Sequence, residues 1–137
     1  MRDVDEPALT TQLSQPAFRM KLGREVSINK KALYALGCPE HILFWWNKSQ
    51  RVLLIGVSPK ETPLSFKISA NYYNSKTMFK IRKHQFIKNL LKVAKWHRNA
   101  IYAVIGEYIS ELNMVAFRLD NAEILEFGSK IGADGDE

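Results

Sequence analysis

Basic side chains concentrate between Lys76 and Arg98, and an array of cations of this kind is suited to binding phosphate. The stretch contains no acidic residue, and none occurs anywhere between Thr62 and Gly106. Solvated helices commonly mix both signs of charge at i and i±4, whereas this stretch does not. A row of lysines can lie along a phosphate backbone and release its counterions. The candidate phosphate contacts here are Lys76, Lys80, Arg82, Lys83, Lys88, Lys92, Lys95 and Arg98.

A second basic cluster lies nearer the N-terminus and adds Arg24, Lys30 and Lys31 as candidate phosphate contacts. Three aromatic residues could stack on bases or on a nucleotide: Tyr72, Tyr73 and Trp96. Each cluster has an ordinary alternative. The lysines can form the solvated face of an amphipathic helix, and each aromatic side chain taken singly is more often packed in a core.

Residues for catalysis are sparse. The sequence has no P-loop, dinucleotide fingerprint, His-Glu-x-x-His motif or cysteine pair. His41, His84 and His97 together with a distant acid could form a metal site, but surface or structural histidines are the interpretation we favour. We expect Cys38 to be a small packed residue rather than a nucleophile. The sequence therefore predicts no enzyme, no metal site and no cofactor.

The net charge of +6 understates the basic character of the central part of the chain. Residues 8–119 hold 18 lysines and arginines against five acids, a net charge of +13. This balance favours a polyanionic partner, and nucleic acid rather than a membrane, because no long basic amphipathic helix is evident. We expect no leader peptide, and no apolar run approaches the ~20 residues that span a bilayer. With one cysteine, a reducing cytoplasm is the expected location.

The elements that would position these residues follow a repeated plan of strand, helix and hairpin. Val26 and Ile28 alternate with polar residues as in a half-buried strand, and Asn29 can cap a helix that begins at Lys30. Gly37 and Pro39 would end that helix. Two strands, His41–Trp46 and Arg51–Val57, would then form a hairpin. Phe18–Leu22, with its alternating basic residues, is expected to be an edge strand.

The same plan returns 53 residues later, where Phe79 and Ile81 take the places of Val26 and Ile28. A strand there would lead into a longer amphipathic helix over Lys83–Lys95. The expected strands around it are Leu64–Ile68, Ile101–Tyr108, Met114–Leu119 and Asn121–Phe127. Two copies of one plan suggest a fused pseudo-dimer.

The ungapped pattern Val26-x-Ile28-Asn29-x-x-Ala32-x-x-x-Leu36-Gly37, followed by a hairpin, resembles the swapped-hairpin DNA-binding domain of AbrB, MazE and SpoVT-type proteins. The resemblance covers mainly residues 23–57. It implies a barrel closed by exchanged hairpins and binding to DNA. The family usually has proline at Asn29 and a basic residue at Leu33. The chain also resembles uncharacterised small proteins of clostridial phages and mobile elements.

We therefore predict an α+β, β-rich pseudo-dimeric barrel with a flexible arm (1–17), two halves sharing one core (18–58 and 64–127) and an acidic tail (128–137). The leading partner is duplex DNA, bound without catalysis by a transcriptional regulator or an accessory factor of a phage or mobile element. Two alternatives are a module that sequesters a small phosphorylated or nucleotide ligand, and an inhibitor or antitoxin that binds an acidic protein. The protein would be a monomeric pseudo-dimer or a homodimer.

Overall fold

The computed structural model describes residues 15–127, which form an α+β fold with two α-helices in that range. The predicted acidic tail and most of the predicted arm lie outside the described residues. In chain order the elements are β1 (Ala17–Lys21), β2 (Glu25–Ile28), α2 (Lys30–Ala35), β3 (His41–Asn47), β4 (Val52–Val57), β5 (Phe66–Lys67), the 3-10 helix η1 (Ala70–Asn74), β6 (Phe79–Ile81), α3 (His84–Ala94), β7 (Ala100–Ile109), β8 (Met114–Arg118), the 3-10 helix η2 (Leu119–Asn121) and β9 (Glu123–Phe127).

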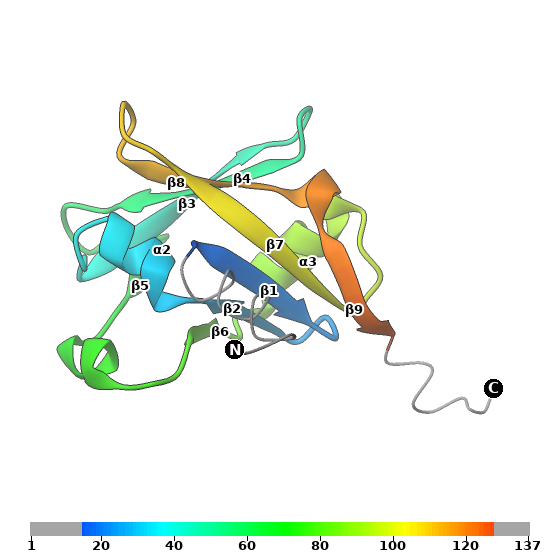
Figure 1. Ribbon diagram of the computed structural model, residues 1–137, viewed down its shortest axis with the longest axis horizontal. Coiled ribbons are helices and arrows are strands. Elements are labelled where there is room, and N and C mark those ends of the chain that lie inside the picture. The colour runs from blue at the N-terminus through cyan, green and yellow to red at the C-terminus, as the bar shows by residue number, and fades with distance from the viewer. Residues whose placement is uncertain (1–14, 128–137) are drawn as a thin grey trace, which may run out of the picture.

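All described strands belong to one antiparallel sheet that curls into a half-barrel (Figure 1). Its strand order is β5-β3-β4-β8-β7-β1-β2-β6, and β9 pairs with β7 outside this path. The two predicted hairpins, β3–β4 and β7–β8, are both present and are joined to each other through β4 and β8. Strands from both halves of the chain therefore build one continuous sheet.

The strand β1 is not at an edge of the sheet, so that prediction was wrong. Phe18 pairs with Ile28 of β2 on one side and with Val104 of β7 on the other. The side chains of Phe18 and Met20 are fully buried, while Arg19 and Lys21 project from the opposite face. Alternating basic residues on one face do not exclude a central strand, because an antiparallel sheet can keep one face in water.

The junction between β2 and α2 follows from local chemistry, as the sequence predicts. The backbone N–H of Ala32 donates to Oδ1 of Asn29 (3.1 Å), which is the expected cap. Asn29 also ties down the start of β1, since its Oδ1 accepts from the N–H of Ala17 (3.0 Å) and its Nδ2 donates to the carbonyl of Gln15 (2.7 Å). Gly37 has a φ of +87° at the end of the helix, which suits glycine.

Both helices pack their apolar faces into one core with the inner face of the sheet. Phe18 of β1 and Phe117 of β8 lie at its centre, 5.4 Å apart between ring centroids. In Figure 1 α2 lies to the left, while α3 lies to the right behind β7. Phe86 of α3 packs on Phe44 of β3, with ring centroids 4.7 Å apart. This contact holds α3 against the first hairpin.

The long strand β7 changes partners along its length, which allows the sheet to curl. Residues 100–105 pair with β1 and β9, and residues 106–109 pair with β8. The change occurs at Gly106, whose cross-strand neighbour is Phe117. A Cβ at Gly106 would lie 2.5 Å from the Phe117 ring. The absence of a side chain there lets this buried ring cross the strand.

The second half departs from the predicted plan in two places. The strand expected over Leu64–Ile68 is reduced to the two residues of β5, and the aromatic loop around Tyr72 contains η1. No hydrogen-bonded pairing joins β5 to β6, so the half-barrel stays open between them. Within residues 15–127, no helix has the length and apolar character needed to cross a bilayer.

Candidate nucleic-acid interface

The helix α3 separates its apolar and basic side chains as its periodicity predicts. Lys88, Lys92 and Lys95 are all exposed, and they form no ion pair with any described residue. Lys88 and Lys92 are one helical turn apart, and Lys95 ends the helix with a left-handed φ of +61°. The opposite side of the helix is buried and consists of Ile87, Leu90, Leu91 and Ala94. The lysines thus form a row about 10 Å long, at 1.5 Å per residue.

The start of α3 also favours an anion. Its first turn contains no acidic residue, and the N-cap residue Lys83 makes no side-chain cap hydrogen bond. The exposed N–H groups of a helix start attract negative charge. The ammonium group of Lys83 lies 5.5 Å from the centroid of the Phe66 ring, which holds this cation beside the start of the helix.

The two basic clusters lie far apart in the sequence, but they meet in the fold where Gly23 packs closely against Arg98. Gly23, between β1 and β2, has a φ of +65°, and a Cβ there would lie 2.7 Å from Cβ of Arg98. Leu22 donates its N–H to the carbonyl of Ala100 (3.0 Å) at the same place. Arg24 and Arg98 consequently line one hollow of about 360 Å³ together with Leu22, Gly23 and Asn99.

Arg82 lies in the adjoining hollow, but its charge is partly neutralised. Its Nη2 and Nε atoms lie 2.9 and 3.0 Å from Oε1 of Glu25. Lys21 and Arg24 line the same hollow of about 290 Å³. The side chain of Arg82 remains 67% exposed, so the pair is accessible to solvent. We expect Arg82 to contribute less to anion binding than Arg24 or Arg98.

Lys30, Tyr72 and Tyr73 are partly buried and contact one another. The Lys30 ammonium group donates to the carbonyl of Tyr73 (3.3 Å) and lies 5.4 Å from the centroid of the Tyr72 ring. Tyr73 donates its hydroxyl to the carbonyl of Pro39 (2.7 Å). Burial raises the pKa of Tyr72 to about 12 and also raises the pKa of Tyr73. Lys30 and both tyrosines are therefore engaged in packing.

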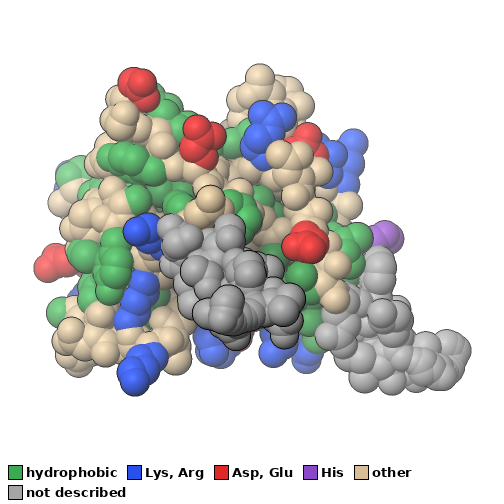
Figure 2. Space-filling model, viewed as in Figure 1, with side chains coloured by type: hydrophobic (Ala, Val, Ile, Leu, Met, Phe, Trp, Pro, Cys, Tyr) green, Lys and Arg blue, Asp and Glu red, His purple; other side chains and the backbone are tan. Residues whose placement is uncertain are grey.

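The remaining predicted cations Lys31, Lys76 and Lys80 are exposed on α2, after η1 and on β6. Lys80 is opposite Ser27, which is opposite Arg19, so Lys80 and Arg19 share one face of the sheet. Figure 2 shows lysine and arginine side chains along the lower edge of the molecule, over β2, β6 and the segment before β6. The acidic side chains visible on this face lie above this edge, and further basic side chains lie among them at the upper right.

The third stacking candidate, Trp96, is also used within the fold. Its ring stacks on Tyr102 at 4.4 Å between centroids and 8° between planes, so this face is occupied. Cys38, predicted to be packed, is instead exposed, with a φ of +54°. Within residues 15–127 no cluster of three or more His, Cys, Asp or Glu side chains could hold a metal ion.

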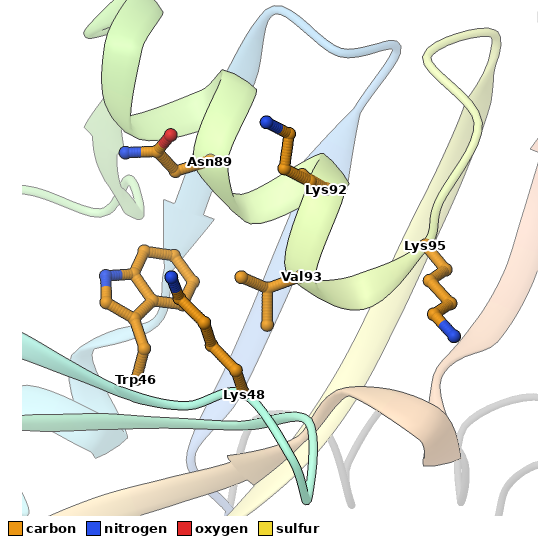
Figure 3. A pocket seen from close by; sticks show the side chains of 6 residues that line it. All are labelled: Trp46, Lys48, Asn89, Lys92, Val93 and Lys95. Atoms are coloured by element: carbon orange, nitrogen blue, oxygen red, sulfur yellow. The ribbon is translucent and has the colours of Figure 1, made fainter.

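The structure adds a cavity that sequence reasoning missed (Figure 3). It has a volume of about 390 Å³, lies between α3 and the β3–β4 turn, and is lined by Trp46, Lys48, Asn89, Lys92, Val93 and Lys95. Trp46 faces the inner side of the sheet and is half-buried, whereas Trp45 is 38% exposed on the other face. Successive side chains of a strand point to opposite faces, which accounts for the two orientations, but nothing in the sequence indicates that α3 leaves space beside Trp46.

Comparison of the chain with family models, curated proteins and solved structures finds no match.

Proposed function

We propose that the protein binds duplex DNA without catalysis, through a continuous basic path along α3 and the β1–β2 turn. The observation that carries the proposal is the contact of Gly23 with Arg98. This contact places Arg24 beside Arg98. Arg98 in turn follows Lys95, the last lysine of the row, by only three residues. The path therefore runs from Lys88 along the helix to Arg24.

The composition of this path supports contacts to phosphate more than readout of base edges. Its members are Lys88, Lys92, Lys95, Arg98, Arg24 and Lys21, all of them exposed. None of them forms an ion pair with an acid among residues 15–127. Cations without acidic partners neutralise phosphates and release counterions, and this term is independent of base sequence. Weak sequence discrimination is the expected result.

The pairing of β2 with β6 supports the further proposal of a fused, swapped-hairpin-like pseudo-dimer. Val26 pairs with Ile81 and Ile28 pairs with Phe79, while Ile81 and Phe79 lie 53 residues after Ile28 and Val26. A two-fold rotation that exchanges the two halves would exchange these two pairs. The resemblance to AbrB, MazE and SpoVT-type domains points the same way, and the setting we propose is a regulator or accessory factor of a phage or mobile element.

The test replaces the lysine row and measures the salt dependence of binding. The variant K88Q/K92Q/K95Q should lower the slope of log K against log salt by about 2.7 on a random duplex, since each lost phosphate contact contributes about 0.9. The matched control K60Q/K67Q changes two exposed lysines outside the path and should leave the slope within about 0.5 of the wild-type value. An equal loss of slope per charge removed in the two variants would mean that net charge, and not this path, determines binding.

A further inference from the structure

Hydrogen bonds hold the backbone around the cavity beside Trp46. Arg51, which follows the β3–β4 turn, donates from Nη2 to the carbonyl of Ala94 at the end of α3 (2.5 Å). The N–H of Leu119 donates to the carbonyl of Arg51 (2.8 Å), which ties the turn to η2. Oδ1 of Asn47 accepts from Ser49 and Gln50 inside the turn. Because these bonds already hold the backbone, a ligand would have to order only the exposed side chains that line the cavity.

One wall of the cavity is suited to a flat aromatic ring. Trp46 packs against Phe86 with centroids 5.6 Å apart, yet it remains half-buried and borders the cavity (Figure 3). Asn89 enters from α3, and its Oδ1 accepts from Nε2 of Gln85 (3.2 Å). The amide NH₂ group of Asn89 is then left to donate to an acceptor on a ring edge. An indole face beside an amide donor is a combination that binds nucleobases.

The other wall is cationic. Lys48 extends from the turn, Lys92 lies on α3, and Lys95 is the C-cap residue of α3. Among residues 15–127 no acidic side chain lines the cavity. None of these three lysines forms an ion pair with a described acid. In Figure 3 the ammonium group of Lys48 lies beside Trp46, whereas those of Lys92 and Lys95 extend away from it in different directions. Rotation of these exposed side chains would bring them to a phosphate attached to a ring that is stacked on Trp46. The volume of about 390 Å³ lies in the range of small-molecule sites, roughly 300–1,000 Å³.

We infer that this cavity binds one nucleoside phosphate, with its base stacked on Trp46 and its phosphate held by Lys48, Lys92 and Lys95. The ligand has two sources with the same chemistry, a free mononucleotide or an unpaired nucleotide within a strand. The inference goes beyond duplex binding, which needs no base contact, and it shares Lys92 and Lys95 with the proposed duplex-binding path. The cavity can bind its ligand even if duplex DNA does not bind.

The test follows the indole N–H signals of the three tryptophans by ¹H–¹⁵N NMR on the full chain. The variant W46F removes one signal and so assigns it. Adenosine 5′-monophosphate should shift the Trp46 signal in a saturable manner and leave the Trp45 and Trp96 signals in place. The variant K92Q/K95Q should weaken this binding by about tenfold or more, because it removes charge-assisted contacts. The matched control K60Q/K67Q removes the same number of charges at exposed lysines outside the cavity and should bind as the wild type does.

The choice of ligand distinguishes a free mononucleotide from an unpaired nucleotide in a strand, and it separates the role of Trp46 from that of the lysines. A shift with the mononucleotide assigns the site to free nucleotides, and a shift only with an oligodeoxyadenylate of about ten nucleotides assigns it to an unpaired base in a strand. A Trp46 signal that neither ligand moves overturns the inference. Adenosine that binds as tightly as its monophosphate overturns the role of the lysines. These outcomes do not depend on the duplex titration, so either proposal can fail alone.

Discussion

The Asn29 side chain connects the first strand, the first helix and the start of the described chain, so its removal should have a large effect. Asn29 is 8% exposed, and Asn29→Ala removes its side-chain hydrogen bonds to Ala17, Gln15 and Ala32. Loss of the helix cap costs about 1 kcal/mol. The N–H of Ala17, left without its acceptor in the part-buried β1, adds about 1 kcal/mol more. Water can replace the contact to the carbonyl of Gln15, which is exposed. The free energy of unfolding should therefore fall by about 2 kcal/mol.

Urea denaturation followed by circular dichroism measures this loss, with the m-value as the check that both states are otherwise unchanged. Asn29→Asp is the matched control, because it keeps the oxygen that accepts from Ala32 and Ala17 and loses the donor to Gln15. A carboxylate at a helix start is also favourable. The control should lose less than about 1 kcal/mol. Equal losses in the two variants would refute the assignment of the stability to Oδ1.

Two further substitutions test the packing and the electrostatics of the fold. Gly106→Ala places a Cβ against the buried Phe117 ring and should lower the free energy of unfolding by about 1–3 kcal/mol. Gly37→Ala tests backbone strain alone, because Gly37 has open space around it but a φ of +87°. An unchanged urea midpoint for Gly106→Ala would contradict the close packing. Burial raises the pKa of Tyr72 from 10.0 to about 12, so its contribution to stability is present below pH 10 and is lost as pH rises toward 12. Between these pH values the wild type should lose more stability than Tyr72→Phe, and parallel losses would show that the tyrosine does not titrate differently on folding.

Local chemistry made much of the fold predictable. Asn29 as a cap, Gly37 as a left-handed residue and the period of α3 each depend on neighbouring residues, and each predicted element is present. The position of β1 could not be predicted in the same way. Phe18 pairs with Val104, far away in the sequence, and nothing local to either strand specifies that partner. The swapped-hairpin arrangement stays a proposal for the same reason, because it depends on the pairing of strands that are far apart in the sequence.

In the candidate site too, features set by neighbouring residues could be predicted and features set by distant contacts could not. The exposure of Lys88, Lys92 and Lys95 follows from helical period, and the structure has all three exposed. The engagement of Lys30 with Tyr72 and Tyr73 joins residues more than 40 positions apart, so the sequence could not show that this cation is held inside the fold. The cavity beside Trp46 depends on the separation of α3 from a hairpin turn, which no residue pattern encodes.

Binding of the wild-type protein to a random duplex of about 25 base pairs, measured by fluorescence anisotropy across a salt series, tests the proposed function most directly. The three lysines of α3 alone predict a slope of log K against log salt of about −2.7, and Arg24, Arg98 and Lys21 would make it steeper. A slope of this size would show that the path neutralises several phosphates. Absence of binding at low salt, or a slope near zero, would contradict a phosphate-binding surface on this protein.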